Sequence, residues 1–166
     1  TGASIAGGVC SVTAVLTPTG DSHIEMETRM PVEGWNGKFL GVGNGGWAGS
    51  ISMGAMAAAL QDGYATASTD TGHQGGGGSF ALGHPEKLLD YGYRAVHEMT
   101  VTAKKVVSAF YGRPARLAFW NSCSNGGRQA LMEVYRRHSQ AFTSAEIDRA
   151  RVVALQFASV LSRLYA

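Results

Sequence analysis

The order of strand-like and helix-like segments is the feature that most constrains the fold of this 166-residue chain. Residues 9–16 are rich in β-branched side chains, and residues 24–30 alternate apolar and polar side chains, as in a half-buried strand. The turn signal Thr17-Pro18-Thr19-Gly20-Asp21 separates them, so an antiparallel pair is expected. Further strands are expected over residues 38–42, 64–69 and 116–120.

Helical patterns lie between the later strands. Residues 52–62 are rich in alanine and methionine and end at Gly63. Residues 88–110 repeat apolar side chains every three or four positions, and residues 126–137 follow as another helix. Alternating strands and helices favour an α/β fold with a mostly parallel sheet and right-handed crossovers. Preceded by an antiparallel N-terminal pair, this order is typical of the first half of an α/β-hydrolase, truncated here after the last of these helices.

Composition indicates one globular, partial domain over residues 1–166, since 45% of residues are hydrophobic and 16% charged. Residues 138–166 are expected to form a divergent helical tail, with a capping box at residues 143–146 and one apolar face beyond it. The net charge of +2 comes from scattered basic residues, which argues against a nucleic-acid partner. No apolar run approaches the roughly 18–20 residues that span a bilayer, and no signal peptide is visible.

The segment Ser122-Cys123-Ser124-Asn125-Gly126 matches the nucleophile elbow, small-x-Ser-x-Gly, between a predicted strand and a predicted helix. Small residues flank the serine because the turn is too tight for larger side chains, and the strain turns its hydroxyl outward. The first position is usually glycine, so Ser122 is a mild departure. The alternative is an ordinary turn with a capping serine, but the position in the strand order favours Ser124 as a catalytic nucleophile.

An acyl-transfer serine also needs an oxyanion hole. One donor is expected to be the backbone N–H of Asn125, and the other is expected in the glycine-rich loop after the third predicted strand, residues 43–47. Glycines in such a loop let a backbone N–H face the substrate. The spacing Gly41-x-Gly43-x-x-Gly46 also fits a dinucleotide fingerprint, but no acidic residue follows the next strand in the required role.

Five motifs in order resemble the tannase and feruloyl esterase family, from about Cys10 to about Arg137. Bacterial hydrolases of mono(2-hydroxyethyl) terephthalate are related to that family. The motifs are Gly34-Trp35-Asn36-Gly37-Lys38-Phe39, Gly41-Val42-Gly43-Asn44-Gly45-Gly46, Thr69-Asp70-Thr71-Gly72-His73, Asp90-Tyr91-Gly92-Tyr93-Arg94-Ala95 and Cys123-Ser124-x-Gly126-Gly127-Arg128-Gln129.

The resemblance implies a secreted or periplasmic serine esterase that needs no cofactor and acts on small esters of aromatic acids such as gallate, ferulate or terephthalate. Ser124 would carry the acyl group, and Gly46 and Asn125 would supply the oxyanion hole. Cys123 would correspond to the cysteine that pairs with one beside the catalytic histidine. Cys10 would resemble a second family cysteine whose partner lies upstream. From the residues alone, the two cysteines could instead pair with each other or stay reduced.

The chain also departs from the family, whose members are roughly three times as long, in keeping with a large fold and an inserted lid. The triad order is Ser, Asp or Glu, then His. Beyond Ser124, His138 is the only histidine, and along one helix it would lie about 18–20 Å away. The catalytic Asp and His, the lid, the family's calcium site and both cysteine partners are therefore expected to be missing, and no metal-ligand pattern replaces them.

Three functional hypotheses follow. The first is an ester hydrolase acting through Ser124, the second a non-catalytic fragment or binding module, and the third one part of an enzyme assembled from a complementing chain or a homo-oligomer. A sheet that ends early is also expected to expose an edge and an apolar patch.

Three further residues are assigned to the site loops. His73 could act as a base, although a structural role in holding the glycine loop is favoured. Trp47, beside Gly45 in that loop, would either stack on an aromatic acyl group or pack against the protein.

Overall fold

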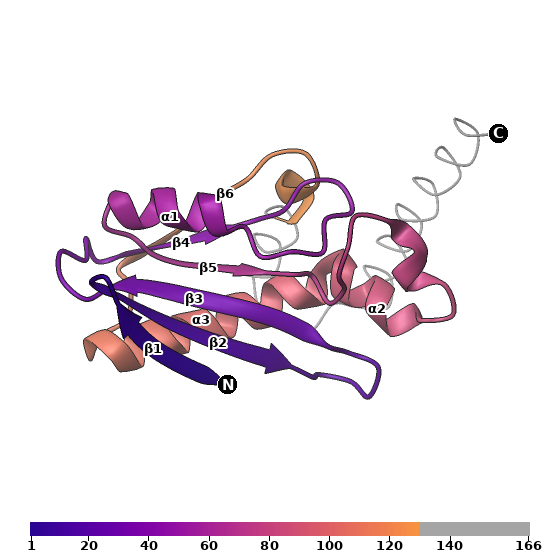
Figure 1. Cartoon of the computed structure of the whole chain (residues 1–166), viewed down its shortest axis with the longest axis horizontal. Coiled ribbons are helices and arrows are strands. Elements are labelled where there is room, and N and C mark those ends of the chain that lie inside the picture. The colour runs from indigo at the N-terminus through magenta and orange to yellow at the C-terminus, as the bar shows by residue number, and fades with distance from the viewer. Residues whose placement is uncertain (130–166) are drawn as a thin grey trace. The chain divides into compact units, whose positions relative to one another are not determined.

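A computed structural model describes residues 1–129 of the chain. The expected tail over 138–166, His138 and most of the helix expected over 126–137 lie outside these residues. The described part contains a six-stranded sheet in the order β1-β2-β3-β5-β4-β6 (Figure 1). Its strands are β1 (Gly2–Ala6), β2 (Val9–Leu16), β3 (Ile24–Pro31), β4 (Lys38–Val42), β5 (Ala65–Thr69) and β6 (Leu117–Asn121).

The sheet has an antiparallel and a parallel part. Strands β1, β2, β3 and β5 pair antiparallel in turn, whereas β4 lies parallel to β5 on one side and to β6 on the other. This arrangement confirms the α/β class and the antiparallel pair at the start. Strand β1 was not expected, because its residues Gly-Ala-Ser-Ile-Ala show little alternation. It extends the antiparallel part by one strand.

The helices follow the expected order with one correction. Helix α1 (Met53–Gln61) lies where the pattern predicted it. The single helix predicted over 88–110 is instead three pieces: α2 (Pro85–Leu89), the π-helical turn η2 (Asp90–Arg94) and α3 (Ala95–Tyr111). Apolar spacing could not predict the π turn, because such a turn adds only one residue and leaves the spacing nearly unchanged. A short 3₁₀ helix, η1 (Gly78–Ala81), lies between β5 and α2.

Helices α3 and α1 cover opposite faces of the sheet (Figure 1). The core lies under α3, where Val96, Met99, Ala103 and Val107 pack on alternate residues of the strands. Those strand residues are Cys10, Met26, Met30, Phe39, Ala65 and Ala67. Burial of both faces explains why all five residues of β5 are inaccessible to solvent.

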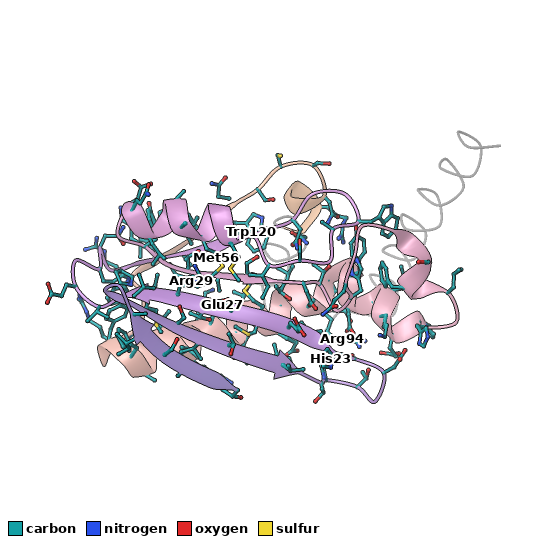
Figure 2. All side chains as sticks on the ribbon, viewed as in Figure 1. His23, Glu27, Arg29, Met56, Arg94 and Trp120 are labelled. Carbon is teal, nitrogen blue, oxygen red and sulfur yellow. The ribbon has the colours of Figure 1, made fainter. Side chains whose placement is uncertain are left out.

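The face under α1 is more polar. Arg29 Nε lies 2.6 Å from Glu27 Oε1, and the Arg29 guanidinium also donates to the sulfur of Met53 at 3.2 Å. Figure 2 labels this pair on β3 together with Met56, which α1 buries completely. The ion pair satisfies Glu27, which is only 6% exposed.

Strand β6 forms the edge of the sheet within the described residues. Its side chains alternate, and Leu117 and Phe119 are 48% and 46% exposed. An apolar edge of this kind agrees with the expectation from sequence. The oligomeric state that was inferred from it stays a prediction.

Candidate active site

Ser124 lies in a strained turn between a strand and a helix. Strand β6 ends at Asn121, and the helix begins at Asn125. Ser124 has φ 54°, and among residues 1–129 the only other non-glycine residue with positive φ is Thr71. Such a conformation costs on the order of 1–3 kcal/mol and persists only where the surroundings impose it. Ser124 is exposed to solvent, as a nucleophile elbow requires.

Gly126 is required by Ser122. A Cβ at position 126 would overlap both Cβ and Oγ of Ser122, and it would lie 3.2 Å from the carbonyl oxygen of Asn44. The close approach follows from the tightness of the elbow, which brings residues two before and two after Ser124 together. The small-x-Ser-x-Gly pattern is therefore a steric condition of this turn.

The glycine-rich loop begins where β4 ends, and its glycines have two different roles. A Cβ at Gly41 would lie 2.7 Å from Trp120 Cε3, and one at Gly43 would lie 2.7 Å from Trp120 Cζ2. These two glycines make room for the indole of Trp120, whose Nε1–H donates to the carbonyl of Gly126 at 2.8 Å. In contrast, Gly45 and Gly46 have no atom within 4 Å of an added Cβ, so these two glycines are the ones with free space beside them.

The side chains of Asn44 and Gln129 join the glycine loop to the elbow helix. The N–H of Asn44 donates to Gln129 Oε1 at 3.3 Å, and Gln129 Nε2 donates to Asn44 Oδ1 at 3.4 Å. Asn44 Nδ2 also donates to the carbonyls of Ser50 and Thr69, at 2.6 and 2.9 Å. Both amides are buried. Both residues lie inside the quoted motifs, but no role was predicted for either from the sequence.

Gly46 and Asn125 are the expected oxyanion-hole donors. Gly46 has φ 53° and is exposed, and Asn125 is the first residue of the elbow helix, whose leading N–H groups have no intrahelical acceptor. Among residues 1–129, neither N–H donates a hydrogen bond. Within residues 1–129, both N–H groups are therefore without an acceptor. Their role as an oxyanion hole stays a prediction.

The structure favours a structural role for His73. Its Nε2 lies 2.8 Å from the carbonyl oxygen of Trp47, and its Nδ1 lies 3.3 Å from Thr71 Oγ1. A carbonyl can only accept, so Nε2 carries the proton. The ring also stacks on Phe80 with centroids 3.7 Å apart, and it is 5% exposed. His73 therefore anchors the glycine loop through Nε2, while the Thr71 hydroxyl donates its proton to the carbonyl of Asp70 at 2.6 Å.

Trp47 packs against this protein's own residues. Its ring stacks on Tyr91 with centroids 4.8 Å apart and meets the edge of Phe80 at 6.1 Å. A Cβ at Gly78 would lie 3.7 Å from the indole. These contacts favour packing over stacking on an acyl group.

Tyr91 and Arg128 also lie at this site and were not singled out from the sequence. The Tyr91 hydroxyl donates to the carbonyl of Gly46 at 2.6 Å. Arg128 lies over the Tyr91 ring, 4.9 Å from its centroid, and Arg128 Nε donates to Asn125 Oδ1 at 2.8 Å. Both residues lie inside the quoted motifs, and this membership was the signal available in the sequence.

Cys10 is buried in β2 and Cys123 is exposed at the elbow, and both are free thiols within the described residues. Pairing between the two is therefore not observed, and the partners implied by family resemblance stay predictions. Over residues 1–129 no three His, Cys, Asp or Glu side chains gather as a metal site. In the same range no helix is long and apolar enough to cross a membrane.

Asp70, at the end of β5, has the most clearly perturbed carboxyl near the site. Burial raises its pKa from 3.8 to about 6, against the lowering effect of hydrogen bonds from the N–H groups of Gly72 and Glu25. Those N–H groups donate to Asp70 Oδ1 at 2.8 and 3.0 Å. The carboxyl therefore carries much less charge near pH 5 than an exposed aspartate does.

Stability is expected to fall as pH rises from about 4 to about 6. The folded state holds the Asp70 proton more tightly than the unfolded chain, so this contribution is complete below the unfolded pKa and lost as pH passes the folded pKa. The expected change is roughly 2 kcal/mol after allowance for solvent screening. Urea unfolding at several pH values measures it.

Asp70→Asn is the matched variant, because its amide oxygen can still accept both N–H bonds. Burial also raises the pKa of Asp90, so Asp90→Asn is measured in parallel. A slope unchanged by Asp70→Asn would contradict the assignment to Asp70.

This protein is an α/β-hydrolase by fold, with a strained serine at the end of a parallel strand. The chain belongs to the tannase and feruloyl esterase family, whose model, described as "Tannase and feruloyl esterase", matches residues 10–163. The match continues past Arg137, where the motif resemblance was expected to end.

Curated relatives agree with this membership. An uncharacterized esterase of Xanthomonas campestris pv. campestris is 43% identical over 129 residues, which are 76% of this chain and 22% of that protein. A probable feruloyl esterase B-1 of Neosartorya fischeri is 37% identical over 127 residues, 76% of this chain and 24% of that protein. The chain thus spans about a quarter of the length of these relatives.

Solved structures agree on the fold. Feruloyl esterase B from Aspergillus oryzae superposes with a TM-score of 0.74 at 33% identity, covering 78% of this chain and 26% of that chain. The tannin acyl hydrolase from Aspergillus niger gives a TM-score of 0.67 at 24% identity, covering 77% of this chain and 26% of that chain, and supports the fold alone.

Proposed function

We propose that this chain carries the nucleophile of a carboxylic ester hydrolase that acts on esters of aromatic acids. The observation that carries the proposal is the backbone of Ser124, held at φ 54° at the end of β6 and exposed. No ordinary capping serine needs this conformation, whereas a nucleophile elbow does. The relatives named feruloyl esterase support the substrate class.

In the proposed reaction Ser124 Oγ attacks the ester carbonyl carbon and loses its proton to a base. The carbonyl oxygen becomes an oxyanion, and the N–H groups of Gly46 and Asn125 donate to it. Collapse expels the alcohol, which takes up a proton, and leaves an acyl group on Ser124. Water then hydrolyses this acyl-enzyme and releases the aromatic acid.

The base is the part that residues 1–129 do not supply. No histidine or carboxylate within that range forms a hydrogen bond with Ser124, and His73 is occupied as an anchor. This observation favours a second candidate, in which the chain is one part of an assembled enzyme and another polypeptide, or a second copy, completes the triad. A measurement of the mass of the wild-type chain in solution tests the second-copy form, which a monomer would contradict.

Ser124→Ala tests the nucleophile. In the enzyme with its base in place, turnover of methyl ferulate and p-nitrophenyl acetate is expected to fall by about 10³-fold or more, because the acyl-enzyme cannot form. Ser122→Ala is the matched control: it removes a hydroxyl from the same turn and leaves the reactive one, so activity should stay within about threefold of wild type.

Mass spectrometry adds a direct readout, since a fluorophosphonate should add to wild type and Ser122→Ala but not to Ser124→Ala. Unchanged turnover in Ser124→Ala, or labelling of another residue, would show that the nucleophile assignment is wrong.

A secreted or periplasmic location is a separate proposal, based on the resemblance, and fractionation of the native host tests it.

A further inference from the structure

Three consecutive carbonyl groups of the glycine loop, those of Gly45, Gly46 and Trp47, are each held by a different partner. The N–H of Ala48 donates to the carbonyl of Gly45 at 3.0 Å, the Tyr91 hydroxyl donates to that of Gly46 at 2.6 Å, and His73 Nε2 donates to that of Trp47 at 2.8 Å. A trans peptide is planar, so fixing a carbonyl also fixes the N–H of the next residue on the opposite side.

Such restraint matters most at Gly46. This residue lies at φ 53° and has no neighbouring atom within 4 Å of a Cβ position. Glycine has the largest backbone freedom of any residue, so the conformation of Gly46 depends on the hydrogen bonds made by its flanking peptides. The Ala48 bond to the Gly45 carbonyl fixes the peptide plane that contains the Gly46 N–H, and the Tyr91 bond to the Gly46 carbonyl fixes the next plane. The two bonds together therefore limit the backbone rotation at the predicted donor.

Tyr91 in turn is connected to the elbow through Arg128. The guanidinium donates to the backbone carbonyl of Tyr91 at 2.9 Å, to the carbonyl of Gly92, and to Asn125 Oδ1 at 2.8 Å. Tyr91 and Gly92 belong to the π-helical turn η2, and such turns are frequent at functional sites. Burial lowers the pKa of Arg128, yet an arginine remains charged at neutral pH.

We propose that Tyr91 and Arg128 are positioning residues. They fix the two oxyanion donors, Gly46 and Asn125, relative to each other by linking both to the π-helical turn η2. Tyr91 holds the glycine loop by its hydroxyl and Trp47 by its ring. Arg128 joins the elbow to η2, because Nε donates to Asn125 while its other two nitrogens donate to the carbonyls of Tyr91 and Gly92. Neither side chain needs to touch the substrate. This inference rests on the proposed function and assigns to it two residues outside the triad and the hole.

Tyr91→Phe tests the first half of the proposal, because it removes the hydroxyl and keeps the ring. For p-nitrophenyl acetate, kcat and the rate of fluorophosphonate addition to Ser124 are expected to fall about 10- to 100-fold, with KM changed less than about threefold. A purely structural role would lower the amount of folded protein without separating kcat from KM.

Tyr111→Phe is the matched control. The Tyr111 hydroxyl also donates to a backbone carbonyl, that of Pro31, at the same distance of 2.6 Å, but at the far end of α3. Its loss should leave kcat and labelling within about twofold of wild type. Arg128→Lys keeps the charge and loses the forked set of donors, so it should lower kcat and labelling as Tyr91→Phe does. Arg113→Lys changes an arginine that lies over Trp35 and should leave both rates near those of wild type.

Hydrogen exchange provides a readout that does not depend on activity. Amides of residues 44–49 are expected to exchange faster in Tyr91→Phe than in wild type or Tyr111→Phe. Equal exchange in all three would overturn the inference. Wild-type kcat and labelling rates in Tyr91→Phe would also overturn it and leave the proposed function standing. If instead wild type and Ser124→Ala behave alike with the esters, the proposed function fails, and the exchange result alone decides whether the two residues hold the loop.

Discussion

Gly126→Ala is expected to destabilise the fold by about 3 kcal/mol and to lower the reactivity of Ser124 at least tenfold. The added methyl would overlap Cβ and Oγ of Ser122. A rotamer change can move Oγ, but Cβ is fixed to the backbone, so the elbow itself has to open. Opening the turn relaxes the positive φ of Ser124 that presents its hydroxyl. Urea unfolding and fluorophosphonate labelling measure the two effects.

The double variant Ser122→Gly/Gly126→Ala provides the control. Removing the Ser122 side chain removes the atoms that the new methyl meets, so most of the lost stability and reactivity should return. The remaining 3.2 Å approach to the Asn44 carbonyl limits full recovery. A double-mutant cycle should therefore show strong coupling between the two positions. Additive effects would contradict the steric explanation of the elbow.

Asn44→Asp is expected to destabilise the protein by about 3–5 kcal/mol at pH 7. Asn44 is 4% exposed, and its amide nitrogen donates to the carbonyls of Ser50 and Thr69. A carboxylate would place acceptors against both carbonyls in a buried site. The folded state would therefore raise the pKa of the introduced carboxyl far above its unfolded value.

The cost of Asn44→Asp is expected to be smaller at pH 4.5, since a protonated carboxyl can donate one bond, and to grow as pH rises. Because Asp70 makes wild type pH-dependent as well, the quantity to measure is the difference from wild type in urea unfolding at each pH. Asn36→Asp is the matched control. Its amide donates to the carbonyl of Asp62 at an exposed site, where water can solvate the charge, so a comparable loss there would contradict the argument from burial.

The glycines show which features of the site could be predicted from the sequence and which could not. The small-x-Ser-x-Gly pattern predicted a tight turn around the nucleophile, and the elbow does require Gly126. Sequence alone could not distinguish Gly41 and Gly43, which make room for Trp120, from Gly45 and Gly46, which stay open. The distinction depends on β6 lying beside β4, and the two strands are separated by more than seventy residues of chain.

The π-helical turn η2 is a second feature that could not be predicted from the sequence. Apolar spacing predicted one helix over residues 88–110, where the structure has α2, η2 and α3 in succession. Periodicity tolerates one additional residue in a turn, so it could not show that η2 brings the Tyr91 and Gly92 carbonyls to Arg128.

By itself the sequence determined the order of strands and helices, the elbow around Ser124 and membership of the family, because periodicity, turn chemistry and ordered motifs are local properties of a chain. Only the tertiary structure decided which side chains hold the site together. The pairs Asn44–Gln129 and Tyr91–Gly46 join residues 85 and 45 positions apart. Such contacts depend on how the sheet and its helices pack, and packing is a property of the folded chain as a whole.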